Sequence, residues 1–172
     1  SELIIGEAAV REHMKGLFPD WRAPGVSACL HEHRGGFAYS TDAVQGLAQN
    51  ARKLASGLRA QGLEPGTSVG LILPNIPQFA EALYGSWING NVVVPMNVLL
   101  TAPEIRYLVD DSAIRALFVF EMFLPQVEAA IADMPQPPKV FVIGNAGKHT
   151  AYAALIQGQQ PAPARESSPD EH

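Results

Sequence analysis

The chain has 172 residues, of which 47% are hydrophobic and 17% charged, and its formal net charge is -5 at pH 7. This length suffices for one domain with a substantial core, and the acidic balance without a basic stripe argues against a nucleic-acid partner. No apolar run approaches the roughly 18 residues that cross a bilayer, and the first ten residues contain no basic residue of a secretory signal. The single cysteine, Cys29, cannot form an internal disulfide, so we expect a cytoplasmic protein without a transmembrane segment.

In chain order, the first predicted elements are a helix, a hairpin and a longer helix. Residues 7–18 are loosely amphipathic and are followed by a proline, which predicts a short helix. Residues 26–39 contain two β-capable runs around an Arg-Gly-Gly turn, which is typical of a β-hairpin. Apolar residues then recur at three- and four-residue steps over 42–61, and this spacing predicts a helix that ends at Gly62.

From residue 63 onwards, strand and helix signals alternate. Four runs rich in Val, Ile, Leu and Phe predict strands at 68–73, 91–94, 115–120 and 138–144. Helices are predicted after each strand, at 75–88, 101–109, 121–134 and 150–156. Asn75 is the expected N-cap of the first of these helices, and Thr101 with Glu104 forms a capping box for the second.

This alternation predicts the fold class. Strands that are nearly continuous in apolar residues are typical of a parallel sheet covered on both faces. With right-handed crossovers, the expected fold is a doubly wound α/β domain with a mostly parallel sheet, helices on both faces and a short N-terminal hairpin. We expect this domain over residues 1–157. Residues 158–172, rich in proline, serine and acidic residues, are expected to form a flexible linker or disordered tail.

Ligands of such folds bind beyond the carboxyl ends of the strands. Asn75 follows one predicted strand, and Pro95, Met96 and Asn97 follow the next. These residues are the candidates for a ligand-binding wall. A purely structural interpretation competes with this one, because N-capping explains Asn75 and a turn explains Asn97 without any ligand.

The stretch VFVIGNAGKHT has some features of a phosphate-binding loop. However, only two residues separate Gly144 from Gly147, and His149 rather than Ser or Thr follows Lys148. The phosphate-binding motif needs four residues between its glycines and a hydroxyl after the lysine. The sequence therefore favours a polar turn before a short helix.

Three further groups of residues are candidates for functional sites. His31 and His33 share one face of a strand, but no third metal ligand lies at a useful spacing. Asp110-Asp111 is best interpreted as a solvated helix end. Tyr84 and Trp87, three residues apart on a predicted helix, favour a buried core stripe over a pocket lining. The residues alone therefore contain no recognisable catalytic set.

Several short motifs over residues 51–119 resemble the early part of the adenylate-forming acyl-CoA synthetases, which include fatty-acid–CoA ligases and firefly luciferase. They occur in the expected order: Leu-Ala-x-x-Leu, Gly-x-x-Pro-Gly-x-x-Val, Leu-Pro-Asn, Gly-x-Val-x-Val-Pro-x-Asn, and Leu-x-x-x-Glu-Ile-x-Tyr before Asp-Ser. The Val-Pro-Met-Asn segment is most similar to that of ligases for fatty and aromatic acids.

The resemblance implies a two-step reaction that uses ATP, Mg²⁺ and CoA. A fatty or aromatic carboxylate forms an acyl-adenylate, and the CoA thiol then displaces AMP. In such an enzyme Asn75, Pro95, Met96 and Asn97 would line part of the substrate pocket. The family's Ser/Thr/Gly-rich phosphate loop, its adenine-binding segment and its C-terminal catalytic lysine have no counterpart in this chain. We therefore expect an N-terminal fragment that is inactive alone and whose partner is the remainder of the ligase.

A non-catalytic flavodoxin-like binding or assembly module is the alternative function. A sheet separated from its neighbours exposes a strand edge and apolar surface, and both favour a homodimer.

Overall fold

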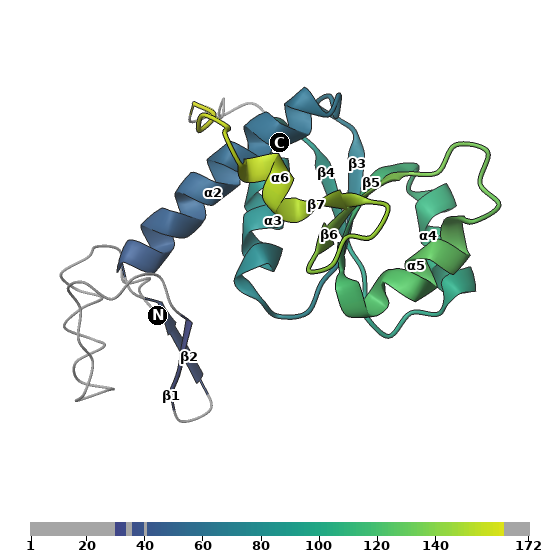
Figure 1. Cartoon of the computed structure of the whole chain (residues 1–172), viewed down its shortest axis with the longest axis horizontal. Coiled ribbons are helices and arrows are strands. Elements are labelled where there is room, and N and C mark those ends of the chain that lie inside the picture. The colour runs from purple at the N-terminus through teal and green to yellow at the C-terminus, as the bar shows by residue number, and fades with distance from the viewer. Residues whose placement is uncertain (1–29, 34–35, 40, 164–172) are drawn as a thin grey trace, which may run out of the picture. The chain divides into compact units, whose positions relative to one another are not determined.

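The computed structural model describes residues 30–33, 36–39 and 41–163, which fall into two compact units that meet in sequence at Leu47 and Ala48 (Figure 1). Each unit is considered by itself. The helix predicted at 7–18 lies outside the described residues.

The first unit contains the predicted hairpin. Strands β1 (Leu30–His33) and β2 (Gly36–Tyr39) pair antiparallel. Helix α2 follows as Thr41–Ala60, one residue earlier at each end than the periodicity predicts. Gly62, with a φ of 77°, takes the left-handed conformation expected just after a helix.

The second unit is built on a five-stranded parallel sheet, in the order β4-β3-β5-β6-β7. The strands are β3 (Ser68–Ile72), β4 (Val92–Pro95), β5 (Ile114–Phe120), β6 (Lys139–Ile143) and β7 (Thr150–Ala151). The two-residue β7 falls where the sequence predicts the start of a helix, which instead begins at Tyr152. Two residues are too few to produce a recognisable strand pattern.

Helices follow the strands as predicted: α3 (Pro77–Asn89), α4 (Ala102–Asp111), the 3-10 turn η1 (Glu121–Phe123) with α5 (Leu124–Ile131), and α6 (Tyr152–Ile156). The capping box of α4 is confirmed: the Glu104 carboxylate accepts hydrogen bonds from the Thr101 backbone N–H at 2.8 Å and from its hydroxyl at 2.7 Å. Both bonds lower the pKa of Glu104, and the bond from the hydroxyl has the larger effect.

The predicted N-cap of α3 is wrong. Ile76, not Asn75, occupies the N-cap position and makes no side-chain cap bond. Pro77 explains the shift, because its fixed φ and missing N–H suit the first helical position and so start the helix there. The Asn75 carboxamide then lies one residue too early to cap it.

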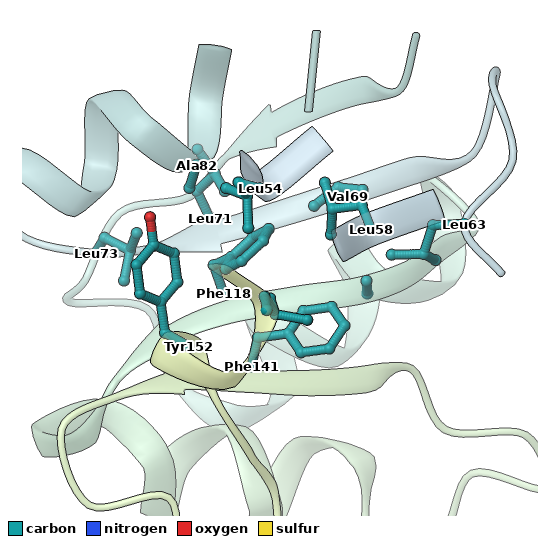
Figure 2. Packing of buried hydrophobic residues seen from close by; sticks show 12 residues of the cluster. Leu54, Leu58, Leu63, Val69, Leu71, Leu73, Ala82, Phe118, Phe141 and Tyr152 are labelled. Atoms are coloured by element: carbon teal, nitrogen blue, oxygen red, sulfur yellow. The ribbon is translucent and has the colours of Figure 1, made fainter. Parts of the chain in front are cut away.

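Alternate residues along each central strand face two separate cores. On one face, Phe118 of β5 and Phe141 of β6 pack at a ring-centroid distance of 5.3 Å, together with leucines of α2 (Figure 2). On the other, Leu117 and Val119 pack against α4 and α5. Figure 1 shows α2, α3 and α6 on one side of the sheet and α4 and α5 on the other. The predicted doubly wound α/β fold is therefore confirmed.

Candidate functional site at the carboxyl edge of the sheet

The carboxyl ends of β3 to β6 lead into four loops along one edge of the sheet. The strand order places β3 beside both β4 and β5, so the chain moves outward to β4 after β3 and outward in the opposite direction to β6 after β5. Such a reversal is the topological switch point at which open α/β sheets bind ligands. Asn75 follows β3, and Pro95 ends the neighbouring β4, with Met96 and Asn97 directly after it. The four predicted wall residues thus come from two adjacent strand ends.

Pro95 is the last residue of β4 rather than the first residue beyond it. The backbone N–H groups of Val92 and Met96 donate to Thr67 and Leu71 on the β3 side at 3.1 and 2.8 Å. Because donors alternate along a strand, the nitrogen of Pro95 faces away from β3, where its missing hydrogen costs no ladder bond. Since β4 is an edge strand, Pro95 also removes a donor that another strand could use.

Met96 is buried in the core that packs against α4 and α5, with 6% of its surface exposed. Its methyl group lies over Gly70 of β3, where an added Cβ would stand 2.6 Å from it. Gly70 therefore makes room for the Met96 side chain beneath the strand end.

The two asparagines are exposed. The Asn97 side-chain oxygen accepts the N–H of Leu99 at 2.9 Å, and its carbonyl accepts that of Leu100 at 3.2 Å. This is the turn-forming role that the structural interpretation of Asn97 predicts. The turn does not exclude contact between the exposed Asn97 side chain and a ligand.

A hollow of about 650 Å³ opens beside the ends of β5 and β6. It is lined by Phe120, Glu121, Met122, Leu124, Asn145 and Gly147. Glu121 is fixed within it, because its Oε2 accepts the backbone N–H of Asn145 at 2.6 Å. The hollow combines apolar walls with one oriented carboxylate, and none of these residues was predicted as part of a site.

The suspected phosphate loop is the turn between β6 and β7, as its spacing predicts. Besides the Asn145 amide held by Glu121, the Gly147 amide donates to the Asn145 side chain at 3.1 Å. Two amides that a phosphate would need are therefore already engaged. Within residues 30–33, 36–39 and 41–163, no three His, Cys, Asp or Glu side chains are grouped to hold a metal ion.

A buried polar network joins α2, α3 and the first residue of α6. Glu81 accepts hydrogen bonds from the Tyr152 hydroxyl at 2.6 Å and from the Asn50 amide at 2.7 Å, and only 7% of Glu81 is exposed. Burial, and secondarily the Glu81 carboxylate, raises the pKa of Tyr152 far above its ordinary value. None of these three residues lines the hollow, and their hydrogen bonds tie the helices together, so we assign the network a structural role.

The predicted burial of the aromatic stripe on α3 is wrong. Tyr84 and Trp87 are 48% and 52% exposed and pack edge to face at 5.6 Å. Val92, on the edge strand, is 53% exposed. In the part of the chain that the structure describes, no helix has the length and apolarity to cross a membrane.

Comparison with known proteins gives a consistent result. The profile of the AMP-binding enzyme family matches residues 39–172. A fatty acid–[acyl-carrier-protein] ligase of Streptomyces coeruleorubidus is 32% identical over 117 residues, which cover 68% of this chain and 22% of the relative. A 4-hydroxybenzoate–CoA/benzoate–CoA ligase of Rhodopseudomonas palustris is 34% identical over 95 residues, which cover 55% of this chain and 18% of the relative.

The fold has solved counterparts. A benzoate CoA ligase from Burkholderia xenovorans superimposes with a TM-score of 0.69 at 21% identity, over 94% of this chain and 30% of that one. The chain spans about a fifth of the length of the curated relatives it matches. The ordered motifs, the doubly wound sheet and a family profile that covers most of the sequence agree, and the chain belongs to the AMP-binding enzyme family.

Proposed function

We propose that this chain is the N-terminal portion of an ATP-dependent acid–CoA ligase. The parent enzyme converts a fatty or aromatic carboxylic acid to an acyl-adenylate and then to an acyl-CoA thioester, in the cytoplasm. The observation that carries the proposal is the family match over residues 39–172, supported by relatives named as ligases of fatty and aromatic acids.

In this proposal the loops after β3 and β4 form part of the wall of the substrate pocket. Asn75, Pro95 and Asn97 are exposed at adjacent strand ends, so they are available to a ligand or to the rest of the enzyme. Met96 contributes to this wall indirectly, because its buried side chain packs over Gly70 and supports the backbone of the loop after β4.

ATP, Mg²⁺ and CoA would be held mainly by the remainder of the parent chain. The described residues do not fit a nucleotide phosphate at the β6–β7 turn, because its amides bind Glu121 and Asn145 instead. They also offer no cluster of metal ligands. We therefore assign no catalytic step to a described residue.

The test is acid-dependent exchange of pyrophosphate into ATP, measured on the parent enzyme with a panel of fatty and aromatic acids. Exchange that requires both an acid and Mg²⁺ supports the proposal. If every acid leaves exchange at the no-acid background, while the enzyme is folded, the proposal fails.

The second candidate function is a non-catalytic flavodoxin-like binding or assembly module that forms a homodimer. The exposure of Tyr84, Trp87 and Val92 favours it, whereas Pro95 weakens pairing through the β4 edge. Light scattering over a wide concentration range tests the assembly module. A strictly monomeric chain counts against the assembly module.

A further inference from the structure

The turn that joins β6 to β7, residues 144–149, leaves the carboxyl end of β6 beside the hollow and returns to the start of β7. We call this segment the strap. Two of its residues, Gly144 and Gly147, have φ values of 107° and 52°, in the left-handed region that favours glycine. Both ends are fixed, because β6 and β7 pair in parallel through Phe141 with Thr150 and Val142 with Ala151. Any movement of the strap therefore arises between two anchored strands.

The first tie on the strap comes from Glu121, at the end of β5. Its Oε2 accepts the Asn145 N–H at 2.6 Å. The contact is close: a Cβ added to Gly144 would stand 2.6 Å from the same oxygen. The absence of a side chain at residue 144 is thus what allows the carboxylate to reach the strap.

The second tie comes from Glu128 on α5. Its Oε1 lies 3.0 Å from His149 Nε2 and 3.1 Å from Lys148 Nζ. The hydrogen bonds from His149 and then Lys148 hold the pKa of Glu128 below its ordinary value. The imidazole side chain is largely buried, at 15% exposure, whereas that of Lys148 is 74% exposed.

We propose that residues 144–149 form a movable strap, hinged at Gly144 and latched over the hollow by the carboxylates of Glu121 and Glu128. Both latching carboxylates belong to the connection between β5 and β6, so that connection and the strap enclose the hollow between them. Asn145 and Gly147 of the strap line the hollow together with Phe120, Met122 and Leu124 of β5 and the segment that follows it. Releasing the latches widens the hollow without breaking the sheet.

The strength of the latches suits a device that opens readily. Both carboxylates lie at the surface, where ion pairs and hydrogen bonds are screened by water and each contributes little. The sheet beneath is far more stable, because its strands are buried on both faces. Loss of one latch should therefore change the open population of the strap by about two- to fivefold and leave the sheet unchanged.

Limited trypsin digestion of the 172-residue chain tests the proposal. Lys148 is an exposed cleavage site within the strap, and Arg115, in the central strand β5, reports on global unfolding. The variants Glu121→Ala and Glu128→Ala each remove one latch. Glu64→Ala, at an exposed position outside the strap, is the matched control for the lost charge.

The expected result is cleavage after Lys148 that is about two- to fivefold faster in both latch variants than in Glu64→Ala, with unchanged cleavage after Arg115. Amide exchange of Asn145 should accelerate in Glu121→Ala over the same range. Latch variants that match the control overturn the proposal. So does equal acceleration at Lys148 and Arg115, because that pattern means general destabilisation. None of these readouts depends on ligase activity, so failure here is separate from failure of the proposed function.

Discussion

Replacing Tyr152 with Phe tests whether the buried network between the helices stabilises the second unit. The Tyr152 hydroxyl donates to Glu81 at 2.6 Å in a site where Glu81 is 7% exposed. Phe keeps the ring, which packs against Phe118 at a centroid distance of 6.0 Å, and removes only the hydroxyl. The perturbation is therefore confined to one hydrogen bond.

The expected loss of stability follows from the hydrogen bonds that Glu81 loses and keeps in Tyr152→Phe. Without the hydroxyl, one Glu81 oxygen loses its partner, and the Asn50 amide at 2.7 Å is left as the other. A hydrogen bond to a charged group contributes roughly 1.5–3 kcal/mol, and an unpaired buried acceptor retains its desolvation cost. We expect Tyr152→Phe to lower the free energy of unfolding by about 2 kcal/mol.

Urea denaturation followed by circular dichroism measures this change, with Tyr107→Phe as the control because Tyr107 is 66% exposed. The control should change stability by less than about 0.5 kcal/mol. A double-mutant cycle with Glu81→Gln should give a coupling energy of about 1 kcal/mol or more. A stability change in Tyr152→Phe no larger than that in Tyr107→Phe, or a cycle without coupling, would show that this hydrogen bond does not stabilise the unit.

Three further predictions concern a helix contact, an acid-sensitive cap and activity. Gly57→Ala should destabilise the chain by about 1–3 kcal/mol, because the new Cβ would meet the Leu155 carbonyl oxygen of α6. Gly46→Ala, where no atom lies within 4 Å of the new Cβ, should raise the free energy of unfolding by up to about 1 kcal/mol. Thermal melts that shift the two variants in the same direction would contradict this. The folded-state pKa of Glu104 lies below its ordinary 4.5, so the capping box stabilises the chain above that pH and loses its contribution as pH falls through the lowered value. In Thr101→Ala, NMR titration should find the Glu104 pKa closer to 4.5, and an unchanged titration would exclude the hydroxyl hydrogen bond as a cause of the lowered pKa. The 172-residue chain alone should form no acyl-adenylate, since the residues that the structure describes include no identified group to stabilise charge on the α-phosphate. Mass spectrometry that detects acyl-AMP above an enzyme-free blank would contradict this.

The sequence predicted most of the fold because the relevant signals are local. Hydrophobic periodicity located α2, and the Thr101–Glu104 pair located the start of α4. The cap predicted at Asn75 failed because two local rules competed, and the proline at residue 77 decided the helix start.

The features that the sequence could not predict depend on pairs that are far apart in the chain. Glu81 and Tyr152 are 71 residues apart, and Glu121 and Asn145 are 24 apart. No spacing rule connects such residues before the strand order is known. The exposure of Tyr84 and Trp87 was missed for a similar reason, because periodicity finds an apolar stripe but not what covers it.

The order of product formation tests the central claim most directly. The parent enzyme is incubated with ATP, Mg²⁺ and a fatty or aromatic acid, first without and then with CoA, and the products are identified by mass spectrometry. An AMP-forming ligase gives acyl-AMP and pyrophosphate without CoA, and then acyl-CoA and AMP once CoA is added. Formation of ADP and phosphate, or no acid-dependent product under either condition, would contradict the account.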